Sequence, residues 1–148
     1  RYKTSKKYSR WPINFACDGE HIKCAQILLG RSPDSKRDVR VVISLSEQNA
    51  TLYKDGEAVL STGVSTGMRG FHTPSGKFVI TNKALNHTSS IYGSSMPYFQ
   101  RLSCQAFGFH AGSCPGYPAS HGCIRMPHSR AKAFYDATEV GDPVEILP

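Results

Sequence analysis

Residues 39–60 read VRVVISLSEQNATLYKDGEAVL, and this stretch decides the fold class expected for the chain. Residues 39–46 are rich in β-branched side chains and partly alternate apolar with polar positions, which is typical of a strand. Within residues 51–60 two short runs flank Asp55-Gly56, a dipeptide that strongly favours a tight hairpin turn. The stretch therefore predicts a strand followed by a β-hairpin.

Further short strands are expected along the rest of the chain. The Ser-, Asn- and Gly-rich segment 85–97 is expected to be a loop, and strands are predicted at 77–83, 98–104, 106–110 and 143–147. After Pro127, the stretch HSRAKAFYDATEVG predicts the one clear helix, because its apolar side chains recur at helical spacing. This pattern predicts a mainly β fold, a β-sandwich or partly closed barrel with one helix in the C-terminal region.

The positive charge is concentrated near the N-terminus. The protein has 148 residues and a net charge of +7. Residues 1–40 hold ten basic and four acidic side chains, whereas the remaining residues hold eight and seven. We interpret residues 1–37 as a basic, irregular N-terminal segment or linker and residues 38–148 as a single domain. The segment is either a solubilising tail or one attracted to a polyanionic surface. No nucleic-acid-binding motif accompanies it, so no nucleic-acid partner is expected.

Five cysteines bear on the compartment of the protein. Cys17 and Cys24 form one local pair, Cys104 and Cys114 form another, and Cys123 is left alone. In an oxidising compartment this spacing predicts two small disulfide loops and one free thiol, whereas in the cytosol all five would be reduced. No apolar run approaches the roughly 18 residues of a membrane span, so none is expected, and the N-terminus lacks the apolar stretch of a signal peptide.

The candidate chemistry lies in residues 110–125. Cys123 is the candidate nucleophile, and a thiol needs a neighbouring base or positive charge to become a thiolate. His121 would share the Cys123 side of an extended strand, and His110 could approach from the preceding strand. The amides of Gly122 and Cys123 could donate to a developing oxyanion. Arg125 offers a planar cation suited to a carboxylate.

Spacing alone leaves other interpretations open. A strand histidine is more often structural than catalytic. A zinc site could be built from His110, Cys114, His121, Cys123 and His128. These residues lack the paired spacing of structural zinc modules, and Cys114 has a disulfide partner available. A zinc site is therefore the weaker interpretation.

The stretch FHAGSCPGYPASHGCIRMP, residues 109–127, resembles the active-site signature of L,D-transpeptidase catalytic domains of the YkuD type. VISLSEQNATLYKDGEAV, GVSTG, HTPSGKFVI and NHTSSIYGSSMPYFQRL precede it in the order found in that family. The resemblance covers residues 39–148 and implies that family's fold. It also implies Cys123 as nucleophile, His110 as general base and His121 as a residue that shapes the pocket and supports the intermediate.

The resemblance also implies residues that bind substrate. Arg125 matches an arginine that we expect to hold a stem-peptide carboxylate, and Tyr98 lies where an aromatic substrate wall is expected, although a core position is equally consistent. Ser120 and Ala111 complete this set. Because Ala111 follows His110 where many relatives have Ser or Gly, a backbone carbonyl is expected to orient the base. His72, His87 and Tyr92 are interpreted as structural.

The implied reaction is acyl transfer on peptidoglycan stem peptides through a thioester, with release of a terminal D-amino acid. Water as acceptor would make the same site an L,D-carboxypeptidase. A non-catalytic peptidoglycan-binding module is a weaker alternative, and a papain-like endopeptidase is disfavoured because its Cys precedes its His. The resemblance implies no metal or cofactor, inhibition by penem β-lactams, an envelope location, and stem peptides or an anchored protein as acceptors. A Cys104–Cys114 disulfide is expected to stiffen the loop between base and nucleophile.

Overall fold

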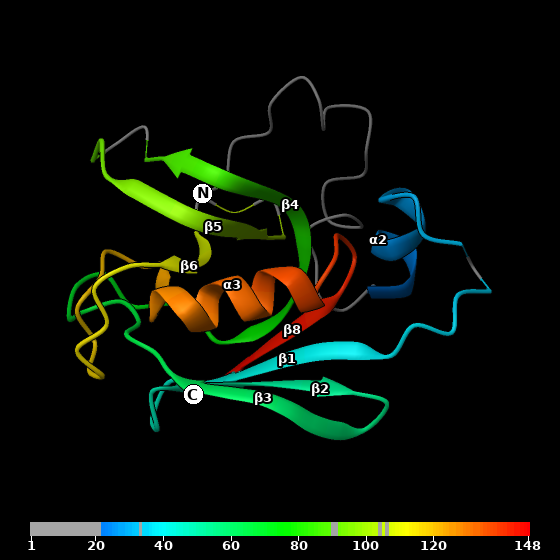
Figure 1. Ribbon diagram of the computed structural model, residues 1–148, viewed down its shortest axis with the longest axis horizontal. Coiled ribbons are helices and arrows are strands. Elements are labelled where there is room, and N and C mark those ends of the chain that lie inside the picture. Colours follow the sequence, from blue (N-terminus) through cyan, green and yellow to red (C-terminus); the bar gives the residue numbers. More distant parts are fainter. Residues whose placement is uncertain (1–21, 33, 90–91, 104, 106) are drawn as a thin grey trace.

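A computed structural model describes residues 22–148 except residues 33, 90, 91, 104 and 106 (Figure 1). In this part of the chain, two helices accompany eight strands. The helices are α2 (Ile22–Leu28) and α3 (His128–Ala137). The strands are β1 (Val39–Ser44), β2 (Asn49–Lys54), β3 (Glu57–Gly63), β4 (Gly76–Thr88), β5 (Ser95–Leu102), β6 (Gly108–Ala111), β7 (Ile124–Met126) and β8 (Pro143–Leu147).

The strands form one open sheet in the order β3-β2-β1-β8-β4-β5-β6-β7. Strand β4 pairs through its first residues with β8 and through the rest with β5, so it carries the sheet from one half to the other. Figure 1 shows this strand curving past the end of α3. Two isolated bridges, Ser65 with Arg125 and Gly67 with Ser120, join the ends of the strand order. The mainly β class is confirmed, and the sheet stops short of a closed barrel.

The hairpin predicted from residues 51–60 is confirmed as β2 and β3. Val41 and Ile43 of β1 and Ala50 and Leu52 of β2 are buried, as their alternation requires. At the turn, Asp55 and Gly56 both have positive φ angles, 53° and 83°, which is the geometry of the favoured two-residue hairpin turn. The buried face of the hairpin contributes to a core that includes Phe109, Ile124, Met126 and Phe134.

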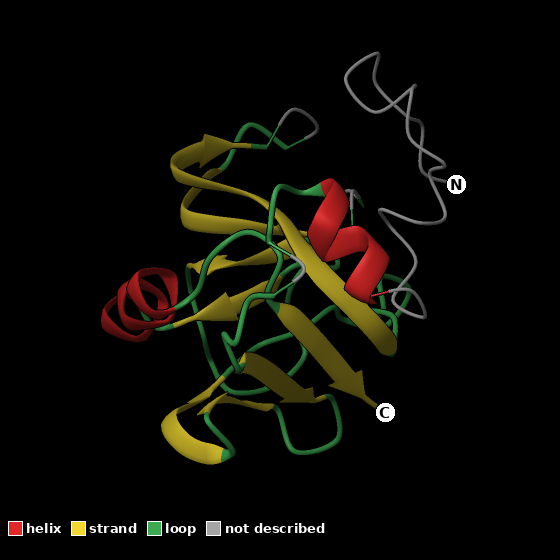
Figure 2. Cartoon of the chain, turned by 90° about the vertical axis from the view of Figure 1, so that its right-hand side faces the viewer, coloured by secondary structure: helices red, strands yellow, loops and turns green. Residues whose placement is uncertain are grey.

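Two local expectations are wrong. Segment 85–97 was expected to be a loop, but β4 continues to Thr88 and β5 begins at Ser95, with His87 opposite Met96. Strand pairing satisfies the backbone here and outweighs the polar composition. Residues 22–28, expected to be irregular, form helix α2, which packs near β4. Figure 2 shows the two helices well apart, with strands between them. No helix among the described residues is long and apolar enough to cross a membrane.

Part of the basic N-terminal segment is anchored to the domain by Asp142. The Asp142 carboxylate is fully buried and accepts hydrogen bonds from Arg31 and Arg37, each at 2.8 Å. It also accepts the backbone N–H of Glu139 at 2.9 Å. A buried carboxylate is stable only when it is paired in this way. Arg31 and Arg37 therefore fasten the chain before β1 to the residues that follow helix α3.

We predict that Asp142→Ala lowers the free energy of unfolding by about 3–5 kcal/mol, because two guanidinium groups and an N–H lose their common acceptor. Urea denaturation followed by circular dichroism measures this. Glu139→Ala is the matched control, because the Glu139 side chain also pairs with Arg31 but is 56% exposed, and its loss costs at most about 1 kcal/mol. Equal stabilities of the two variants would contradict the assigned role of Asp142.

Candidate active site

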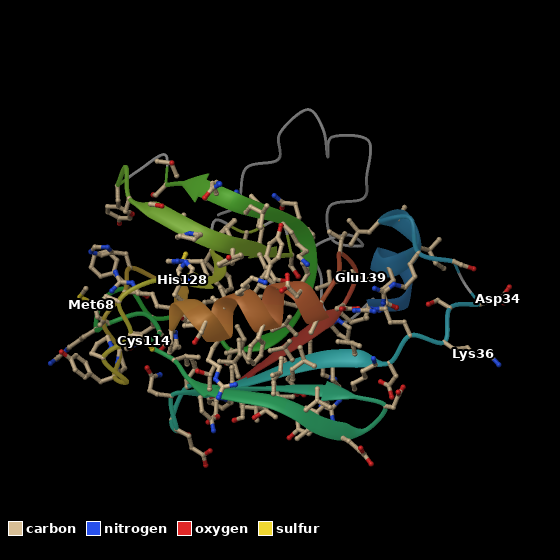
Figure 3. The ribbon with its side chains drawn as sticks, viewed as in Figure 1. Asp34, Lys36, Met68, Cys114, His128 and Glu139 are labelled. Carbon is tan, nitrogen blue, oxygen red and sulfur yellow. The ribbon has the colours of Figure 1, made fainter. Side chains whose placement is uncertain are left out.

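A cavity of about 720 Å³ lies where the β3–β4 loop meets the loop between β6 and β7. In Figure 3 Met68 and Cys114, which belong to these loops, lie at the same end of the molecule as His128, whereas Glu139 lies toward the other end. Most of the sequence-predicted site residues line this cavity: His110, Ser120, His121, Gly122, Cys123 and Arg125. The fold thus brings the candidate nucleophile, base and cation to one cavity.

His110 lies near the end of β6 and pairs in register with Arg125 of β7. His110 is 5% exposed, and its Nδ1 lies 2.7 Å from the carbonyl oxygen of Ala111. Because a carbonyl can only accept, Nδ1 carries the hydrogen and Nε2 keeps its lone pair. Burial lowers the pKa of His110, the Ala111 hydrogen bond opposes this, and the charges of Arg125 and His87 lower it further. The ring is therefore neutral near pH 7.

The carbonyl expected to orient His110 is that of Ala111. Ala111 is 2% exposed and packs in the core, and it is not among the described residues that line the cavity. Ala111 was predicted to bind substrate. In the structure, its backbone carbonyl contacts His110, and its side chain stays in the core.

Cys123 is half-buried and immediately precedes β7. Burial raises the pKa of its thiol, whereas a backbone hydrogen bond from Gly108 and the charges of Arg101 and Arg125 lower it. Burial has the larger effect, so the thiol keeps its proton at neutral pH. The charges of Arg101 and Arg125 reduce the free-energy cost of forming the thiolate, but the protonated thiol remains the resting form.

The turn before Cys123 differs from the expected extended strand. Strand β7 begins only at Ile124, and Gly122 has a φ of 128°, a conformation that favours glycine. The Ser120 hydroxyl accepts the Gly122 N–H at 3.1 Å and donates to the Cys123 carbonyl. The Gly122 N–H is thus already used, and the Cys123 N–H, which has no partner among the described residues, remains as the candidate oxyanion donor.

His121 lies at the rim of the cavity between two aromatic rings. Tyr92 stacks on it with centroids 4.4 Å apart, and Phe71 meets it edge-on at 4.7 Å. Tyr92 is 54% exposed and, like His72, lines the cavity, although both were interpreted as structural. Phe71 was missed, since an exposed aromatic in a loop carries no periodic signal. His87 stacks on Phe99 at 4.4 Å, in keeping with a structural role.

Arg125 and Tyr98 were both predicted to contact substrate, but they lie in different places relative to the cavity. Arg125 lines the cavity, and its guanidinium has no ion pair within the part of the chain that the structure describes. Tyr98 is not among the described lining residues. It packs against His128 at 5.2 Å and Tyr135 at 5.5 Å, both on α3. This placement corresponds to the second interpretation of Tyr98, in which its ring packs against the core.

The predicted Cys104–Cys114 disulfide is absent at Cys114, whose thiol is free among the described residues. Its Sγ is 3.6 Å from the carbonyl oxygen of Gly63, so the side chain is turned toward the end of β3. Cys17 and Cys104 lie outside the described residues, as does the Cys24 side chain. His110, His121 and Cys123, three of the residues weighed as a zinc site, line the same cavity, but in the described chain no three His, Cys, Asp or Glu side chains form a metal-binding group.

Thr73 contacts the turn before Cys123, and no motif in the sequence predicted this contact. Its hydroxyl accepts the Gly67 N–H at 2.9 Å and donates to the Gly122 carbonyl at 2.7 Å. A Cβ at Gly67 would stand 1.8 Å from the Phe71 carbonyl oxygen, so only glycine allows this turn to close. The only sequence signal was the position of Thr73 within HTPSGKFVI.

Comparison with known proteins points to one family. Residues 38–146 match the model of the YkuD family, the L,D-transpeptidase catalytic domain. A Bacillus licheniformis protein bearing the name YkuD is 31% identical over 121 residues, which cover 80% of this chain and 70% of that protein. L,D-transpeptidase 1 of Mycobacterium tuberculosis is 27% identical over 72% of this chain and 49% of its own length.

Solved structures agree with this match. An L,D-transpeptidase from Stackebrandtia nassauensis superposes with a TM-score of 0.70 at 25% identity, covering 88% of this chain and 67% of that one. The L,D-transpeptidase LdtMt1 in complex with imipenem has the same TM-score and identity, over 75% of this chain and 59% of its own. The chain thus spans only part of several relatives. It belongs to the family of enzymes defined by the L,D-transpeptidase catalytic domain.

Proposed function

We propose that this protein is a cysteine acyltransferase that performs L,D-transpeptidation on peptidoglycan stem peptides and releases a terminal D-amino acid. The observation that carries the proposal is the shared cavity of Cys123, His110 and Arg125, with the lone pair of His110 left on Nε2. Membership of the family supports the same reaction. The cell envelope, where this substrate occurs, is the proposed location.

We infer that the Cys123 thiol and the His110 imidazole, which line the same cavity, are both neutral in the resting state. Burial raises the pKa of Cys123 and lowers that of His110, and both effects disfavour a preformed ion pair. Nε2 therefore takes the thiol proton as sulfur attacks the carbonyl carbon of the L,D amide. The resulting oxyanion accepts a hydrogen bond from the Cys123 N–H.

Collapse of this intermediate breaks the amide C–N bond. The His110 imidazolium gives its proton to the departing nitrogen of the D-amino acid, and a thioester to Cys123 remains. The amine of a second stem peptide, or of an envelope-anchored protein, then attacks the thioester while His110 takes the proton of that amine. The thiol is restored when the proton returns to sulfur.

Arg125 supplies the binding half of the site. Arg125 lines the cavity and has no ion pair among the described residues, so its guanidinium is free to bind a stem-peptide carboxylate. The same charge lowers the pKa of Cys123 and that of His110. Arg125 thus favours the thiolate at the moment of attack and keeps the base unprotonated before it.

An L,D-carboxypeptidase is the second candidate. Gly70, Phe71, His72 and His121 line the cavity and are exposed, so water reaches the position of the thioester. Water would then take the acyl group in place of an amine, by the same His110-assisted step.

Incubation with purified disaccharide tetrapeptides, followed by mass spectrometry, tests the activity. Crosslinked dimers with release of a D-amino acid are the expected products of wild type, and tripeptides alone would identify the carboxypeptidase. Cys123→Ala abolishes either product, and His110→Gln lowers the rate by about 10²- to 10⁴-fold. Turnover by Cys123→Ala at the wild-type rate would contradict the proposed cysteine mechanism.

We expect imipenem to acylate Cys123, since a solved relative binds this β-lactam. The sulfur attacks the ring carbonyl, the ring C–N bond opens, and the ring nitrogen takes the proton. Intact-mass measurement should show one added imipenem on wild type and none on Cys123→Ala. An adduct of equal yield on both proteins would place the reaction elsewhere.

The pH dependence of thiol reactivity tests the resting state. Because burial raises the pKa of Cys123, the rate of alkylation by iodoacetamide should still be climbing above pH 8, without a plateau near neutrality. Arg125→Gln removes a charge that lowers this pKa, so its profile moves to higher pH. Arg130→Gln, on the exposed side of α3, is the control and leaves the profile in place. A plateau below pH 7 would mean a preformed thiolate.

A further inference from the structure

The Thr73 hydroxyl joins two segments of the site that are far apart in the chain. Thr73 is 3% exposed, and its Oγ1 contacts the Gly67 N–H and the Gly122 carbonyl at 2.9 and 2.7 Å. The N–H can only donate, so the hydroxyl accepts from it and directs its own hydrogen to the carbonyl. The direction of both hydrogen bonds is therefore fixed.

The Gly122 carbonyl and the Cys123 N–H belong to one peptide unit. That unit is planar and trans, so its C=O and N–H point in opposite directions. A hydrogen bond that holds the Gly122 oxygen therefore also fixes the direction of the Cys123 N–H.

This peptide needs an external restraint. Gly122 has a φ of 128° and no side chain, so its own sterics restrict the rotation of the following peptide less than those of any other residue would. Ser120 binds the peptides on either side, through the Gly122 N–H and the Cys123 carbonyl. Thr73 alone among the described side chains binds the peptide between them.

We propose that Thr73 is a positioning residue that aims the Cys123 N–H at the oxyanion formed during acyl transfer. The inference rests on the proposed function, since it supposes an acyl-transfer step at Cys123. Thr73 acts through the Gly122–Cys123 peptide and contributes neither the nucleophile nor the base.

Two reactions of one sulfur separate this role from a structural one. Acylation by imipenem passes through an oxyanion and needs an aimed N–H. Alkylation by iodoacetamide displaces iodide from carbon and forms no oxyanion, so it reports only on thiolate formation and access. Thr73→Val keeps the shape of the side chain and removes the hydroxyl, whereas Thr73→Ser keeps the hydroxyl.

Thr138→Val is the matched control. Thr138 is 4% exposed, and its hydroxyl hydrogen-bonds Gln100 and the carbonyl of Phe134, away from the cavity. Both valine variants lose a buried hydroxyl and are destabilised, so a general effect of destabilisation would appear in both. Thermal unfolding establishes that each variant is folded at the assay temperature.

We expect Thr73→Val to be acylated between about tenfold and a hundredfold more slowly than wild type, with its iodoacetamide rate unchanged. Thr73→Ser and Thr138→Val should be acylated at rates close to wild type. Equal slowing of acylation and alkylation in Thr73→Val, or wild-type acylation of that variant, would overturn the inference alone. Failure of wild type itself to be acylated at Cys123 would instead overturn the proposed function.

Discussion

Ser65 and Arg125 exchange two backbone hydrogen bonds, at 3.0 and 2.9 Å, where the end of the strand order at β3 meets the end at β7. The pairing continues from Thr66, whose carbonyl accepts the N–H groups of Ala119 and Ser120, to Met68, which donates to the Ser120 carbonyl. The β3–β4 loop is thereby fixed beside the turn that carries Cys123. Both the cavity and the contact of Thr73 with Gly122 depend on this pairing between the two edges of the sheet.

Burial sets the chemistry of the site as much as charge does. It raises the pKa of the Cys123 thiol and lowers that of the His110 imidazole, so both groups are held neutral. In the proposed mechanism, neither group would need to be desolvated as an ion when substrate enters, and the proton would move only as sulfur attacks. Arg125 lies beside this pair and lowers both pKa values.

The opposite end of the domain uses charge for stability instead. Asp142 is buried and completely paired, with Arg31 and Arg37 supplied by the segment before β1. Helix α2 adds a hydrogen bond from Gln26 to the carbonyl of Gly141. These two basic side chains of the segment before β1 therefore serve stability, whereas Arg125, which has no ion pair in the described part of the chain, lines the cavity.

Local pattern was sufficient for features that depend on neighbours in the chain. Alternation and Asp55-Gly56 predicted the hairpin, helical spacing predicted α3, and the signature around Cys123 singled out several of the residues that line the cavity. Tertiary structure alone decided that β4 continues through Thr88, that Ser120 uses the Gly122 N–H, and that Thr73 holds a carbonyl 49 positions away. Periodicity reports which face of a strand or helix a side chain occupies, whereas hydrogen bonds between distant segments depend on where the sheet brings its two edges together.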